Sequence, residues 1–291
     1  GAPVAIKAVV DDEDGRVVGV DFYVDGFIIL EDSAAPWQAT WEETDTASLG
    51  EYTLMAIASD DDGSVASSKV KIIINSEGGF NPELEYGSVS DVDGNSYKTI
   101  VIGSQEWMAE NLRTTRYPDG SPIPMVADSL AWIDLETSDE AYCWFNNSEE
   151  LGLSYGAIYT YEAARAACPA GWHLPDDGEW KILEMELGMS ESEADKHDWR
   201  GTDAGNQLKE EGYTNWDYPS GGSNSSGFTA LPAGFRSSNG SFYGYYGTFW
   251  TASTDTASGQ AWFRSLLAGE DGVLRDHYYK NNGYSIRCVK D

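Results

Sequence analysis

The sequence predicts two domains, an all-β sandwich followed by an α+β domain. Residues 1–76 contain short alternating apolar segments, with turn signals about every ten residues and no helical periodicity. Residues 88–291 contain two helical segments followed by short aromatic strands, which is an α+β plan. Residues 77–87 lie in a glycine- and proline-marked polar stretch that indicates a linker. A chain of 291 residues is long enough for both domains.

The composition excludes some classes of partner. The chain has 18 Lys and Arg residues against 49 Asp and Glu residues, a formal net charge of -31. Nucleic acids and anionic membrane surfaces are polyanions, so this charge argues against both as partners. A solvated, repulsive surface explains the acidity better than adaptation to Ca²⁺. No apolar run approaches the length that spans a bilayer.

The predicted sandwich has four recognisable strands, each with period-2 alternation, around Val4–Val10, Val18–Val24, Tyr52–Ala58 and Val70–Ile74. Two acidic turns, at residues 11–14 and 60–62, precede glycine as calcium-binding loops do. Neither turn has a distal bidentate glutamate at the required spacing. Ordinary turn chemistry, in which Asp accepts local backbone N–H bonds and Gly takes positive φ, is therefore the favoured interpretation.

The first domain resembles the bacterial Ig-like domains of exported proteins. The matching residues are Val20-Asp21-Phe22-Tyr23-Val24-Asp25-Gly26, Ala35-Pro36-Trp37 with Trp41, Gly50-Glu51-Tyr52-Thr53-Leu54, and Ala58-Ser59-Asp60 with Gly63. The resemblance implies that this module is a spacer or an accessory binder.

The second domain begins with a strand and has two capped helices. Residues 97–102 are apolar on both faces, which predicts a strand buried on both sides. Thr160 is the expected N-cap of a helix over Tyr161–Ala167. Asp176 followed by Glu179 three residues later forms the pattern of a capping box for the next helix.

The second domain also resembles a family, the Fibrobacter succinogenes major paralogous domain. The resemblance covers residues 90–291 and depends on Asp93-Gly94-Asn95, Trp107-Met108-Ala109-Glu110-Asn111-Leu112, Cys168-Pro169, Gly171-Trp172-His173-Leu174-Pro175, Gly234-Phe235-Arg236, Ala261-Trp262-Phe263-Arg264 and Gly283-Tyr284-Ser285-Ile286-Arg287-Cys288-Val289. It implies an exported, often lipid-anchored bacterial protein with a C-type-lectin-like fold, related in shape to formylglycine-generating enzymes. The resemblance does not imply a particular biochemical activity. The insert over residues 117–154, which contains Cys143, is the part that the family pattern fixes least.

Three cysteines in this length fit one structural disulfide and one spare thiol in an exported protein, although cytosolic thiols remain open. C-type-lectin-like folds bond the first helix to the last strand, and the positions of Cys168 and Cys288 suit that bond. Cys143 is then a buried free thiol. The alternative is a reactive cysteine pair, as in formylglycine-generating enzymes, but no second cysteine lies near Cys288.

The histidines predict neither a metal site nor a catalytic site. His173, His197 and His277 have no partner at the spacing of a metal-binding motif. His173, between Trp172 and Leu174, is expected to be a core histidine bonded to backbone.

Aromatic residues on polar, glycine-spaced loops are the candidate ligand-binding residues. Exposed rings stack on sugar faces, and the same composition suits protein recognition; core packing is the alternative, and it is favoured for Trp172, Trp180, Trp250 and Trp262. The predicted binding residues are Trp216, Tyr243, Tyr245, Tyr246, His277, Tyr278 and Tyr279.

Calcium is a further candidate ligand. Oxygen ligands in the loop region could come from Asp203, Asn206, Asp217, Asn224 and Asp255, and a generic hydrophilic loop explains these residues equally well. The Glu-Pro-Asn triplet of calcium-dependent lectins is absent, so we expect no sugar binding of that type.

Together these observations predict an extracellular or cell-surface binding protein, not an enzyme, that recognises a glycan or a surface protein. The start at Gly1-Ala2-Pro3 suggests a trimmed end, and a lipid anchor on a removed N-terminal segment is part of the prediction. The alternatives are a structural or adhesion assembly subunit, and an enzyme that uses Glu179, His173 and Cys143.

Overall fold

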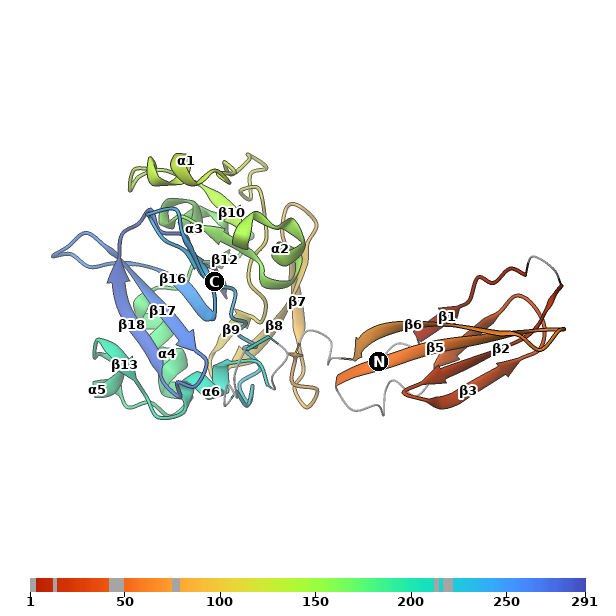
Figure 1. The fold of residues 1–291 in the computed structure, drawn as a ribbon. Helices are drawn as coiled ribbons and strands as arrows, with labels where there is room; N and C mark the ends of the chain where they lie inside the picture. Colours follow the sequence, from red (N-terminus) through yellow and green to blue (C-terminus); the bar gives the residue numbers. More distant parts are fainter. Residues whose placement is uncertain (1–3, 13–14, 42–49, 75–78, 212–214, 217–221) are drawn as a thin grey trace. The chain divides into compact units, whose positions relative to one another are not determined.

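The computed structural model describes residues 4–12, 15–41, 50–74, 79–211, 215–216 and 222–291, and the chain divides into two compact units, residues 1–78 and 79–291 (Figure 1). Phe80, Leu84 and Tyr86 pack against a core cluster of the second unit. The predicted linker over 77–87 was therefore too long, because these apolar side chains attach residues 80–86 to that core. Among the described residues, no helix is long and apolar enough to cross a membrane.

The first unit consists of two facing sheets. Val20 and Phe22 of β2 (Val17–Val24) are buried with Ala39 of β4 (Gln38–Trp41), so the core lies between the sheets. The sequence did not predict β3 (Phe27–Asp32) or β4. Val70 of β6 (Val65–Ile74) is 54% exposed, although it belongs to the predicted alternating segment around Val70–Ile74. The four-stranded sheet has the order β3 (Phe27–Asp32), β2 (Val17–Val24), β5 (Gly50–Asp60), β6 (Val65–Ile74), and the other sheet pairs β1 (Val4–Lys7) with β4 (Gln38–Trp41).

The second unit is mostly strands with a few short helices (Figure 1). One sheet has the order β12 (Trp172–His173), β19 (Val289–Lys290), β9 (Gln105–Met108), β8 (Ser96–Ile102), β7 (Gly87–Ser90). A second sheet has the order β13 (Asp198–Arg200), β18 (Val273–Tyr278), β17 (Ala261–Leu267), β16 (Tyr246–Thr254). Two further pairs join β10 (Tyr142–Trp144) to β11 (Ala157–Tyr159) and β14 (Phe235–Arg236) to β15 (Phe242–Tyr243). The helical segments are α1 (Ser129–Ile133), η3 (Phe145–Asn147), α2 (Glu149–Tyr155), α3 (Tyr161–Ala167), α4 (Asp177–Glu186), α5 (Glu191–Ala194) and α6 (Ala204–Leu208).

Strand β8 separates the two large core clusters of this unit. Tyr97 belongs to one cluster, and Ile100 and Ile102 belong to the other. The strand is thus covered on both faces, as its sequence predicted, although Val101 is exposed.

The two predicted helices begin at their expected caps. Asp176 accepts from the backbone N–H of Glu179, whose carboxylate accepts from the backbone N–H of Asp176, and this capping box starts α4. Thr160 is the N-cap of α3, but its side chain forms no capping bond. Its hydroxyl instead donates to the carbonyl of Asp139 and accepts from the N–H of Ala141, so it anchors the insert rather than the helix.

The predicted disulfide is present: Cys168, directly after α3, is bonded to Cys288 with an S–S distance of 2.08 Å. Close by, β12 runs antiparallel to β19, with Trp172 opposite Lys290. The disulfide and this strand pair therefore hold the connector between α3 and α4 against the end of the chain.

Three buried arginines of the family motifs hold the loops of the second unit together. Arg287 donates to the side chain of Asn111 at 2.6 Å and to the carbonyls of residues 108, 228 and 229. Arg236 donates to the carbonyls of residues 126 and 127 in the insert. Arg264 pairs with Glu184 of α4 at 2.7 Å. Each guanidinium satisfies several acceptors at once, which is how such charges are accommodated in a core.

Candidate functional site

The loop around β15 presents two exposed tyrosines. Tyr243 is 44% exposed and stacks on Phe235, with ring centroids 4.9 Å apart and planes 12° apart. Tyr246 packs edge-on against the same Phe235 ring, with ring centroids 5.6 Å apart. Tyr245 is 60% exposed and has a φ of 68°. The result is a half-buried aromatic cluster whose outermost rings face solvent.

The second tyrosine-rich loop follows β18. Tyr278 and Tyr279 are both about half exposed, and their rings lie 5.0 Å apart in an edge-on arrangement. Tyr278 pairs with Ala261 at one end of β17, whereas Tyr246 pairs with Leu267 at the other end. Six residues of strand correspond to roughly 20 Å. Tyr246 and Tyr278 therefore lie at opposite ends of the sheet, and the ring contacts form within each loop.

Trp216 does not belong to an exposed loop surface. It is 1% exposed, packs in a core cluster, and donates from Nε1 to the carbonyl of Ala230. Its polar neighbours in sequence had suggested solvent exposure, but the indole packs in the core. Trp180, Trp250 and Trp262 are buried as expected, while Trp172 is only partly buried.

His173 differs from the predicted core histidine. Its side chain is 42% exposed and lies between two carboxylates, with Nδ1 2.7 Å from Asp291 and Nε2 2.9 Å from Glu179. Partial burial lowers the pKa of His173, but the hydrogen bonds to Asp291 and Glu179 outweigh that effect and raise it above its ordinary value. The same glutamate caps α4, so His173 belongs to the cap of that helix.

The structure brings together two histidines that the sequence keeps far apart. One ligand atom from each of His197, Asp276 and His277 lies within 4.8 Å of the others. His197 is exposed, and Asp276 and His277 are partly buried. No local motif signals this arrangement, because it arises from the pairing of β13 with β18.

The predicted calcium ligands have other roles where the structure describes them. Asn224 is buried and bonds to the Gly79 carbonyl and to Thr229. Asn206 bonds through its amide nitrogen to Asp203 at 3.2 Å, and Asp255 accepts from the backbone of a turn. Asp217 lies outside the described residues. Hydrogen bonds within the protein thus account for Asn224 and Asp255.

Cys143 is the buried free thiol that the sequence predicted. Burial raises its pKa to about 11, although the nearby charge of Arg236 acts in the opposite direction. A thiol with this pKa is almost entirely protonated at neutral pH, so it is a poor nucleophile.

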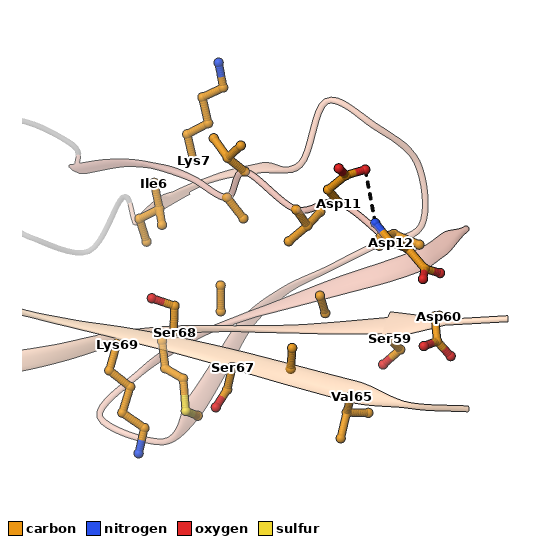
Figure 2. A pocket seen from close by; sticks show the side chains of 18 of the residues that line it. Ile6, Lys7, Asp11, Asp12, Ser59, Asp60, Val65, Ser67, Ser68 and Lys69 are labelled. Atoms are coloured by element: carbon orange, nitrogen blue, oxygen red, sulfur yellow. Dashed lines mark hydrogen bonds between the residues drawn. The ribbon is translucent and has the colours of Figure 1, made fainter. Parts of the chain in front are cut away.

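The first unit contains a groove of about 510 Å³ (Figure 2). It lies between residues 6–12 and strands β5 and β6, and apolar and small side chains line much of it. Ile6 points into the groove, and Lys7 points away from it (Figure 2).

Comparison with known proteins gives two family matches. A family described as the Fibrobacter succinogenes major domain matches residues 100–290, and a family described as a bacterial Ig domain matches residues 1–56. Domains of the second kind are typical of extracellular or surface proteins. No curated protein matches the chain. A solved structure titled "Structures of Clostridium thermocellum CbhA fibronectin(III)-like modules" is 36% identical over 25% of this chain and 77% of its own, with a TM-score of 0.22.

Proposed function

Because the chain belongs to the Fibrobacter succinogenes major domain family and also contains a bacterial Ig-like domain, we propose that it is an exported, cell-surface binding protein. In this proposal the Ig-like domain is a spacer, and the second domain, with a C-type-lectin-like fold, recognises a glycan or a surface protein. A lipid anchor on a preceding segment is part of the same proposal.

The observation that carries the proposal is the conformation of Tyr245. A non-glycine residue with φ near 68° is uncommon, and such strained positions cluster at ligand sites. Here the strained residue is a large, exposed ring beside Tyr243, which the stack on Phe235 holds in one orientation. Rigid tyrosines offer a large contact area at a low entropic cost, which favours recognition of a sugar face or a protein surface.

The proposed role is binding rather than catalysis. The enzyme alternative needs Glu179, His173 and Cys143 in one cleft. His173 and Glu179 meet at the cap of α4, whereas Cys143 is buried in a separate cluster with Trp132. The protonated state of this thiol at neutral pH also favours the binding role.

A glycan array and a cell-adhesion assay test the proposal with the full chain and a Tyr243→Ala/Tyr245→Ala variant. We expect the double substitution to weaken binding at least tenfold, equivalent to about 1.4 kcal/mol or more. Val101→Ala, which shortens an exposed side chain on β8, is the matched control and should bind as the parent does.

The outcomes separate the alternatives. Binding of a protein without any glycan signal would support an adhesion or assembly subunit. A folded parent chain that binds neither glycans nor cells, or a double variant that retains full binding, would refute recognition through these tyrosines.

A further inference from the structure

We propose that His197, Asp276 and His277 form a binding site for a divalent transition-metal ion such as Zn²⁺. The site is independent of the binding proposed for Tyr243 and Tyr245, because neither tyrosine supplies a ligand. The chain has only three histidines, and two of them meet here beside a carboxylate.

The strand register builds the site. β13 pairs antiparallel with β18, and Asp198 is opposite Arg275. Continuing that register by one residue places His197 opposite Asp276, at the point where β13 begins. His277 is the next residue along β18, so the three side chains converge at one end of this strand pair.

Hydrogen bonds orient two of the three groups. Nδ1 of His277 lies 2.7 Å from the side-chain oxygen of Gln260. That oxygen can only accept, so the proton is on Nδ1 and the lone pair of Nε2 is available to a metal. Metal-binding histidines are typically oriented by such an acceptor on the other ring nitrogen. Oδ1 of Asp276 accepts from the backbone N–H of His277 at 2.8 Å, which leaves Oδ2 for the ion.

Arg275 holds the segment before His197 in place through hydrogen bonds. Its guanidinium donates to the backbone carbonyls of residues 195 and 196, at 3.0 and 3.4 Å. Arg275 is also paired with both carboxylate oxygens of Asp177, each at 2.8 Å, and shares this carboxylate with Arg264 and Lys181. It also lies 3.9 Å from the ring centroid of Trp262, against which the rings of His197 and His277 pack edge-on. This packing explains why the two imidazole rings lie together. It does not explain why their nitrogens lie close to the carboxylate of Asp276.

The ligand set determines the class of ion. Two imidazoles with one carboxylate suit Zn²⁺, Ni²⁺, Co²⁺ or Cu²⁺, whereas Ca²⁺ and Mg²⁺ prefer oxygen ligands. Ligands of a tetrahedral zinc ion lie about 3.4 Å apart, so groups now within 4.8 Å have to approach by up to about 1.4 Å. His197 is exposed and can rotate by that much. Three protein ligands leave a position for water or for a ligand from a partner.

Zinc titration of the full chain, followed by calorimetry and by the imidazole NMR signals, tests the site. We expect one equivalent of Zn²⁺ to shift the signals of His197 and His277 and to leave those of His173 unchanged. His197→Gln and His277→Gln should each weaken binding by roughly tenfold or more, and Gln260→Leu should weaken it about 10–100-fold. Excess Ca²⁺ should not displace the zinc.

His173→Gln is the matched control, because it removes the remaining histidine and should bind zinc as the parent does. If His277→Gln disturbs the folding of β18, His197→Gln still tests the site, because His197 is exposed and lies just before β13. Unchanged affinity in His197→Gln, equal shifts at all three histidines, or displacement of zinc by Ca²⁺ would overturn the proposal.

Discussion

Arg264 of β17 donates from Nε to Glu184 of α4 at 2.7 Å, and both side chains are fully buried. The other oxygen of Glu184 accepts from Arg200 of β13 at 2.5 Å. The Glu184 carboxylate therefore connects α4 to two strands of the sheet β13-β18-β17-β16. Tyr246 and Tyr278 lie at opposite ends of this sheet.

Replacing Glu184 with Gln should destabilise the second unit by about 3–5 kcal/mol, because two buried guanidinium groups lose their counter-charge. Urea unfolding monitored by near-UV circular dichroism measures the change. Glu186→Gln, on an exposed residue of the same helix, is the control and should shift stability by no more than about 0.5 kcal/mol. Equal effects of the two substitutions would contradict the role given to Glu184.

Asp177 should make the second unit sensitive to acid. Burial raises its pKa, but hydrogen bonds from Arg275 and the charges of Arg264 and Arg275 outweigh burial and hold the pKa well below the ordinary 3.8. A carboxylate with a lowered folded-state pKa contributes stability that is complete above its unfolded pKa and is lost as the pH falls through its folded value. We therefore expect the free energy of unfolding to fall below about pH 4. Asp177→Asn should be less stable at neutral pH and show a weaker pH dependence in that range; an unchanged slope would argue against this assignment.

Removal of the disulfide should be costly. The bond between Cys168 and Cys288 spans 120 residues of sequence, and the chain-entropy relation gives about 4–5 kcal/mol for such a loop. A Cys168→Ala/Cys288→Ala variant should unfold at a correspondingly lower urea concentration. Reductant should lower the stability of the parent and leave the variant unaffected. A parent chain whose unfolding midpoint is insensitive to complete reduction would contradict the expectation.

His173 should titrate above the ordinary histidine pKa of 6.5, since its carboxylate partners favour the charged form. A raised folded-state pKa contributes stability that is complete below 6.5 and is lost as the pH rises through the folded value. NMR titration of the imidazole signals measures the pKa, and Asp291→Asn should lower it. A His173 pKa at or below 6.5 in the parent would refute the interpretation.

Local chemistry explains the features that could be predicted from the sequence. The cap formed by Asp176 and Glu179 depends on residues three apart, and the bounds of α3 follow from its own pattern. Thr160 also occupies its predicted cap position, yet its hydroxyl bonds to the distant backbone of Asp139 and Ala141. Tertiary hydrogen bonds compete with local ones, and no local rule decides between them.

At the candidate sites, too, tertiary packing and not local sequence decides whether a side chain is exposed. Tyr243 and Tyr245 are exposed, as a glycine-spaced loop suggests. Trp216 has an equally polar neighbourhood in sequence, but its indole lies in the core, because burial depends on what packs over a loop and not on the residues beside it.

The sequence by itself determined the family, the two-domain plan, the helix caps and the exposed tyrosines, because these depend on motifs and short-range patterns. Only the tertiary structure brought His197 to Asp276 and His277, and only strand register placed Tyr246 and Tyr278 at opposite ends of one sheet. The first relationship arises from the pairing of β13 with β18, which are distant in the chain, and the second from the register of the consecutive strands β16, β17 and β18. In both cases the positions depend on which backbone groups pair between strands, which the residues at the strand ends do not show by themselves.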